Sequence, residues 1–218
     1  MIRILSLSFP VLAVLLSCAA IPQEDVGEYI SHYGNPAPEP SHFALCYNHG
    51  CSGTLMVSLN SDQWNEARNV FQPPPENSKE ERQRISLSIG VLETLAGKAT
   101  GTGKFGGIKG WVPGNKFDCI DDAVNTGTYL YMLRNDGLIR FHELRGAAHR
   151  GFLIDGRWPH VATVIVEKET GDAYVVDSWF LDNGNPAFVI PYSEWFAGWK
   201  PVKPQNNPKL SAEKPEVR

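Results

Sequence analysis

The stretch from Asp118 to Gly137 constrains the fold most, because it predicts a helix with a cysteine in its first turn. Asp118 is a favourable N-cap residue, and Asp121 stands three residues later in the capping-box position. The apolar residues after it recur near helical spacing: Ile120, Ala123, Val124, Leu130 and Leu133. Asn135-Asp136-Gly137 is typical of a helix end. Cys119 is therefore predicted to lie at a helix N-terminus.

A thiol in that position is a candidate nucleophile. Unpaired N–H groups and the positive end of the helix dipole favour the thiolate, which is the nucleophilic form of cysteine. The negative charges of Asp118, Asp121 and Asp122 would raise the pKa of Cys119 unless an imidazolium offsets them. The alternative is that Cys119 is only a small apolar residue at a helix start. A catalytic role consequently requires a histidine close to Cys119.

The two ends of the chain differ from its centre. The chain has 218 residues, of which 42% are hydrophobic, which suits one domain with terminal appendages. Residues 1–17 carry Arg3 and an apolar run, as in an export signal peptide. Leu15-Leu16-Ser17-Cys18 resembles a lipobox, in which Cys18 is lipidated and becomes the first mature residue. Ordinary signal cleavage after Ala20 is the alternative.

Cysteine spacing is consistent with export. Cys46 and Cys51 lie close together in the chain, and an oxidising compartment would let them form a disulfide. Cys119 would then be left as the odd thiol of the folded domain. The alternative is a zinc site built from Cys46, Cys51 and His49, for which no fourth ligand is evident.

The first part of the chain predicts a tether followed by helices. Asn35-Pro-Ala-Pro-Glu-Pro40 is a stiff polar spacer, so residues 18–41 are predicted to tether a domain that spans residues 42–200. Within that domain we expect a strand at Thr54–Leu59, a helix at Asp62–Phe71, and a helix that begins with a capping box at Ser78 and ends near Gly97. Its charged face from Lys79 to Arg84 is predicted to be solvated. Residues 201–218 are predicted to be a disordered tail.

The second part predicts an antiparallel sheet. Strands are expected at Gly137–Leu144, Gly151–Ile154, His160–Glu167, Ala173–Trp179 and Phe188–Ile190, followed by a short helix opened by Ser193. Helices followed by antiparallel strands indicate an α+β fold. The glycine-rich segment Thr100–Gly107 lacks the GxxxxGK[ST] spacing of a phosphate-binding loop, so we interpret it as a flexible loop near Cys119.

His160 and Asp177 are the candidate partners of Cys119. His160 opens one expected strand, and Asp177 lies near the end of the next. One register pairs Val164 with Ala173 and sets His160 opposite Asp177, whereas a tighter turn pairs Val164 with Asp177 and separates the two candidates. Only the first register was expected to join His160 to Asp177. The competing bases, each interpreted as structural or surface residues, are His42, His49, His142 and His149.

The ordered set Cys119, His160 and Asp177 resembles the transglutaminase-like branch of the papain-like cysteine enzymes. The stretches DCIDDAVNTGTYLYML, HRGFLIDGRWPHVATVIV and AYVVDSWFLDNG are similar to uncharacterised bacterial exported proteins of that superfamily. The resemblance covers residues 42–200. It implies Cys119 as nucleophile, His160 as general base and acid, and Asp177 as the group that orients the histidine.

The oxyanion hole departs from the family pattern. The papain branch places a glutamine a few residues before the cysteine, whereas the nearest amide here is Asn115. The Cys119 backbone N–H is one expected donor, and Asn115 or the indole N–H of Trp111 is the other. The acids beside Cys119 are expected either to bind a cationic group or to cap the helix.

These features predict an exported hydrolase that cleaves an amide bond through a thioester. The substrate class is a peptide or protein, with peptidoglycan peptides available in the bacterial envelope, where the chain would be lipid-anchored to a membrane. No cofactor or metal is implied, and the formal charge of −4 without a basic stripe disfavours nucleic acid as a partner. The alternatives are an amine-accepting transglutaminase, a noncatalytic envelope lipoprotein that binds a protein or peptide, and a metal site formed by the same trio.

Overall fold

The computed structural model describes residues 20–103, 117–151 and 159–201. Its helices are α1 Val26–Ser31, α2 Ser61–Asn69, α3 Ser78–Thr100, α4 Cys119–Asn135 and α5 Tyr192–Phe196. Its strands are β1 Phe43–Tyr47, β2 Gly53–Val57, β3 His142–Arg150, β4 His160–Glu167, β5 Ala173–Asp177 and β6 Phe188–Pro191. In the described ranges, no helix is both long and apolar enough to cross a membrane.

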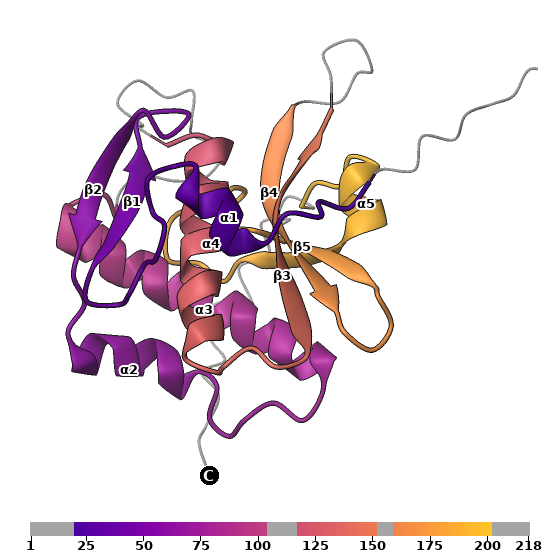
Figure 1. The fold of residues 1–218 in the computed structure, drawn as a ribbon, viewed down its shortest axis with the longest axis horizontal. Helices are drawn as coiled ribbons and strands as arrows, with labels where there is room; N and C mark the ends of the chain where they lie inside the picture. The colour runs from indigo at the N-terminus through magenta and orange to yellow at the C-terminus, as the bar shows by residue number, and fades with distance from the viewer. Residues whose placement is uncertain (1–19, 104–116, 152–158, 202–218) are drawn as a thin grey trace, which may run out of the picture.

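The strands form two antiparallel sheets, which confirms the α+β class. β1 and β2 make a hairpin, and the larger sheet has the order β3-β4-β5-β6. α4 runs between the hairpin and the larger sheet, so it contacts both (Figure 1). Because α4 begins at Cys119, the candidate nucleophile lies at the junction of the two sheets.

The central position of α4 explains its composition. It is buried on nearly every side, and its buried side chains include apolar Val124 and Leu130 as well as polar Asn125 and Thr128. Buried polar groups must be hydrogen-bonded. Thr163 of β4 donates to the carbonyl of Ala123 at 2.8 Å, which fixes the first turns of α4 against the sheet.

The N-terminal part of the domain is more extensive than predicted. α1 lies in the core, with Val26 and Ile30 fully buried, so the prediction of a tether through residue 41 is wrong for this segment. Asn35, within the expected spacer, is also buried and exchanges two hydrogen bonds with the backbone of Ala44. The proline-rich composition gives no indication of these contacts, because they are made to residues that are not adjacent in the chain.

α3 starts one residue earlier than the predicted capping box. Its N-cap is Asn77, whose side chain accepts from the backbone N–H of Glu80 at 3.0 Å. The prediction of a solvated face also fails at Glu81, which is fully buried. Glu81 accepts hydrogen bonds from the backbone N–H groups of residues 140–142 and thereby ties α3 to the start of β3.

The larger sheet confirms some predicted strands and corrects others. β4 has the predicted bounds, and β5 and β6 differ from theirs by one or two residues at one end. β3 begins at His142 instead of Gly137 and continues to Arg150, beyond the predicted end at Leu144. β1 was not predicted as a strand at all. β1 is an apolar run that ends at the disulfide loop, so its sequence does not alternate between apolar and polar residues as expected of a hairpin strand.

Several predictions fall outside the described residues. They concern the export signal at 1–17, lipidation of Cys18, most of the glycine-rich loop, and the tail at 202–218. The oxyanion candidates Trp111 and Asn115 and the rest of the strand expected after Gly151 are also outside.

Candidate active site

Cys119 occupies the first helical position of α4, as the sequence predicted. The Asp118 side chain accepts from the backbone N–H groups of Ile120 and Asp121, each at 3.0 Å. The Asp118 N–H in turn donates to the Asp121 side chain at 3.0 Å, which completes the capping box. Cys119 is a half-buried free thiol held in a defined helix start.

His160 and Asp177 form a buried hydrogen-bonded pair. His160 Nε2 lies 2.8 Å from Asp177 Oδ2, and both side chains are almost completely buried. Trp195 Nε1 donates to the same carboxylate oxygen at 2.9 Å, and the Trp179 N–H donates to Asp177 Oδ1 at 3.3 Å. The Asp177 carboxylate accepts a hydrogen bond from Nε2–H of His160. The other ring nitrogen, Nδ1, is therefore the one that can accept a proton.

The pair forms in a register that the sequence did not predict. Val164 pairs with Val175, midway between the two registers that we considered. The connection is the four-residue segment 168–171, closed by a hydrogen bond from the Gly171 N–H to the Glu167 carbonyl at 2.9 Å. His160 and Asp177 are then diagonal neighbours on one face, a separation that a histidine side chain can span. The prediction that only directly opposite positions would join them is wrong.

Cys119 lies beside the start of β4. The backbone N–H of Val161, the residue after His160, lies close enough to the Cys119 sulfur to lower the pKa of the thiol. α4 also contacts β4 farther along through Thr163 and Ala123. The structure therefore brings the thiol to the strand that carries His160.

The electrostatics around Cys119 favour the protonated thiol. Burial, followed by the negative charge of Asp118, raises the pKa of Cys119 to about 11, and Asp122 adds to the effect. The nearby Val161 N–H lowers the pKa of Cys119 but does not compensate for burial and the acids. Burial and the neighbouring acids therefore outweigh the effect of the helix start, which was expected to favour the thiolate. A base must remove the proton when the sulfur reacts.

Asp122 connects α4 to the end of β5, a contact that the sequence did not reveal. The Ser178 hydroxyl lies 2.9 Å from each oxygen of Asp122, and Ser178 directly follows Asp177. Burial, then the neighbouring charges of Glu93 and Asp177, raises the pKa of Asp122 well above its usual range.

Glu93 of α3 lines the same small cavity as Asp122. The cavity, also lined by Asn125 and Tyr129, encloses about 20 Å³, on the order of one water molecule. Glu93 accepts from the Gly184 N–H at 2.8 Å, and burial raises its pKa to about 7. Two carboxyl groups in such a space retain protons more readily than isolated ones.

We expect Glu93→Gln to alter the pH dependence of stability. The folded-state pKa of Glu93 is raised from 4.5 to about 7, so its contribution is present below pH 4.5 and is lost as the pH rises through 7. The free energy of unfolding of the wild type should fall by on the order of 1–3 kcal/mol as the pH rises across this window, and that of the variant should fall by less. Urea unfolding at both ends of the window measures the difference. Glu66→Gln, at an exposed position of α2, is the matched control, and equal pH profiles for Glu93→Gln and the wild type would contradict the assignment.

The other candidate bases have surroundings that differ from those of His160. His142 is buried, with Nδ1 2.8 Å from Glu81 Oε1 and Nε2 3.1 Å from Arg82 Nη1. His42, His49 and His149 are exposed. His142 is therefore a structural histidine, which is one of the two roles predicted for it.

The structure decides between the disulfide and the zinc site that were considered for Cys46 and Cys51. Cys46 and Cys51 form the predicted disulfide, with Cα atoms 4.7 Å apart, so they are not zinc ligands. Within the described ranges, the cluster with metal-binding spacing is Glu24, Glu28 and His32 at the surface of α1, remote in sequence from Cys119.

Comparison with known proteins adds no relative: no protein-family model, no curated protein and no solved structure matches this chain.

Proposed function

We propose that this chain is an exported cysteine hydrolase of the transglutaminase-like kind, which cleaves an amide bond through a thioester. Cys119 is the nucleophile, His160 the base and Asp177 the group that orients the histidine. The observation that carries the proposal is the buried His160–Asp177 hydrogen bond beside the strand residue that contacts the Cys119 sulfur. A papain-like arrangement of the described helices and sheets belongs to the same proposal.

The mechanism starts from a neutral thiol. As the Cys119 sulfur attacks the substrate carbonyl, Nδ1 of His160 accepts the thiol proton, and Asp177 stabilises the resulting imidazolium. The imidazolium then gives its proton to the leaving amine, and a thioester remains on Cys119. The same nitrogen activates a water molecule, whose attack releases the acid and restores the thiol. An amine in place of water would give a crosslink.

The developing oxyanion needs donors aimed at it. The Cys119 N–H is one candidate, because it lies in the first turn of α4, where backbone N–H groups have no partner within the helix. Asn115 and Trp111 remain the proposed second donors.

The substrate that we propose is a peptide or protein, with peptidoglycan peptides as one class. Three aromatic rings surround His160, with ring centroids 5.2 to 6.4 Å away, from Trp179, Phe180 and Trp195. They shield the imidazole from water on these sides. They also favour an apolar group of the substrate next to His160 over a charged one. On the sequence of residues 1–18 we further propose attachment to a membrane of the cell envelope through Cys18.

A noncatalytic binding protein is the second candidate. The observation that favours it is the raised pKa of Cys119, which keeps the thiol protonated at neutral pH. In this case the His160–Asp177 pair would only join β4 to β5. The two candidates differ in whether Cys119 can be acylated.

We expect 4-nitrophenyl acetate to acetylate Cys119, with a burst of nitrophenolate. Intact-protein mass spectrometry should show one added acetyl group that hydroxylamine removes, since hydroxylamine cleaves thioesters. The Cys119→Ala variant should show neither the burst nor the added group. Equal, slow ester hydrolysis by the wild type and this variant would reject the hydrolase and support the binding protein.

A further inference from the structure

The disulfide loop that precedes β2 adopts an unusual backbone. Asn48, His49, Gly50 and Cys51 have φ angles of 73°, 62°, 65° and 57°, all in the left-handed region. Residues with a side chain rarely adopt this region, and a run of them is strained. Successive residues in such a turn direct their N–H groups toward a common side, which suits an acceptor with negative charge.

The acceptors are the two acids on either side of Cys119. The His49 and Cys51 N–H groups donate to the two oxygens of Asp121 at 2.9 and 2.6 Å. The Gly50 N–H donates to Asp118 Oδ2 at 2.9 Å. Asp118 and Asp121 thus cap α4 and bind the loop at the same time. The expectation that these acids bind a cationic group is replaced by these contacts.

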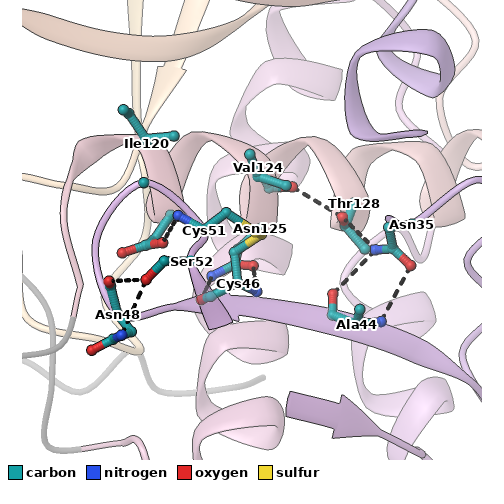
Figure 2. The surroundings of a disulfide bond; sticks show 12 residues. Asn35, Ala44, Cys46, Asn48, Cys51, Ser52, Ile120, Val124, Asn125 and Thr128 are labelled. Carbon is teal, nitrogen blue, oxygen red and sulfur yellow. Dashed lines mark hydrogen bonds between the residues drawn. A yellow bond between two sulfur atoms is a disulfide. The ribbon is translucent and has the colours of Figure 1, made fainter. Parts of the chain in front are cut away.

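The loop is also fastened to the second turn of α4. Asn125 Oδ1 accepts from the Cys46 N–H at 2.7 Å, and Asn125 Nδ2 donates to the Cys46 carbonyl at 3.0 Å. Figure 2 shows this pair beside the Cys46–Cys51 bridge. The disulfide connects the segment held by Asn125 to the segment held by Asp118 and Asp121. The disulfide loop is therefore bound at two places to the first two turns of α4, which carry Cys119, and we call this arrangement the clamp.

We propose that the disulfide loop, residues 46–51, positions Cys119 for reaction and that this action requires the Cys46–Cys51 bond. The proposal rests on the proposed function, because it concerns the same nucleophile. Without the crosslink, the strained left-handed residues can relax and withdraw their N–H groups. The charges of Asp118 and Asp121 would then act on Cys119 without the three loop N–H groups to offset them. The first turn of α4 would also lose its hydrogen bonds to the loop.

The loop can be opened by a thiol reductant. A dithiol supplies two electrons and two protons, the sulfur–sulfur bond breaks, Cys46 and Cys51 become thiols, and the reductant closes into its own cyclic disulfide. Cys51 is half-buried and Cys46 is buried, so attack is expected at Cys51. The clamp thereby makes the reactivity of Cys119 dependent on the redox state of the compartment.

The test is the pH dependence of Cys119 alkylation in the full chain. Iodoacetamide labelling of Cys119, followed by peptide mass spectrometry, is compared between the wild type and the double variant Cys46→Ser/Cys51→Ser. Asp118 and Asp122 of α4 and Tyr29 of α1 interact electrostatically with Cys119. Asp121 lies in the same helix turn, His160 directly precedes Val161 on β4, and His49 belongs to the loop that is bound to Asp121. None of them is changed in the double variant.

We expect the alkylation profile of the double variant to move to higher pH, with a rate at neutral pH on the order of tenfold lower, which corresponds to about one pKa unit. Circular dichroism establishes that the double variant is folded, and reduced wild type provides a second measurement if it is not. Ser52→Ala is the matched control, because it removes a hydroxyl that bonds to Asn48 and leaves the disulfide and the three loop N–H groups intact. An unchanged profile in the double variant or in reduced wild type would overturn the positioning role.

The outcome is separable from that of the proposed function. Acetylation of Cys119 with an unchanged alkylation profile would retain the hydrolase and reject the clamp. A shifted alkylation profile without acetylation would retain the clamp and reject the hydrolase.

Discussion

Replacing His160 by Ala should slow acetylation of Cys119 at neutral pH by roughly 10²- to 10⁴-fold, the range expected for loss of a general base. The reason is that the pKa of Cys119 is raised to about 11, so its sulfur reacts only if another group takes the proton. His160, whose ring is hydrogen-bonded to Asp177, directly precedes Val161, the residue whose N–H lies near the Cys119 sulfur. Stopped-flow measurement of nitrophenolate release gives the rate.

The pH profile of His160→Ala distinguishes a base from a structural residue. As the pH rises through about 11, the thiol ionises without help, so the deficit of the variant should shrink. His149→Ala is the matched control: it removes an exposed imidazole from the neighbouring strand β3, opposite Val161. A deficit that persists at all pH values, or that His149→Ala shares, would contradict general-base action by His160.

Asp177→Ala should reduce the rate less than His160→Ala, because an imidazole without its carboxylate can still accept a proton. The loss also leaves Trp195 Nε1 without its acceptor, since both groups meet at Asp177 Oδ2. Part of the effect will therefore be on stability, which thermal unfolding of the variant separates from the effect on rate.

Local signals in the sequence predicted the parts of the site that local physics determines. Asp118 and Asp121 specify the start of α4 through hydrogen bonds that span three residues. The β-branched run after His160 predicted the bounds of β4. The Cys46–Cys51 bond followed from spacing and the expectation of export. Each of these required only neighbours in the chain.

The remaining features depend on residues that are far apart in sequence. The β4–β5 register is determined by a loop that could close in several ways, and the observed one lies between both predictions. The capture of Asp118 and Asp121 by the disulfide loop joins residues about 70 positions apart. The pKa of Cys119 depends mainly on burial, which a sequence does not state. The His160–Asp177 pairing was thus predicted for the wrong register, and the contribution of burial to the pKa of Cys119 was not predicted.

Glu81 illustrates the same limit and has the largest expected effect on stability. The side chain of this residue is fully buried, and its carboxylate accepts from the backbone N–H groups of Arg140 at 2.6 Å, Phe141 at 3.0 Å and His142 at 3.1 Å. His142 Nδ1 is a further donor at 2.8 Å. Because a guanidinium only donates, Arg82 requires His142 Nε2 to accept, which leaves the ring proton on Nδ1 for Glu81.

Glu81→Ala should therefore lower the free energy of unfolding by about 3–5 kcal/mol, because it leaves several buried donors unpaired as well as a cavity. Glu81→Gln retains one acceptor oxygen but turns an NH₂ group toward donors, so its loss should be smaller, and it provides the measurement if Glu81→Ala does not fold. Lys79→Ala, an exposed position in the same turn of α3, should change stability by less than about 0.5 kcal/mol. Urea unfolding monitored by circular dichroism gives all three values. A loss at Glu81 no larger than that at Lys79 would show that the backbone of residues 140–142 finds other acceptors, and that the tie between α3 and β3 does not depend on this carboxylate.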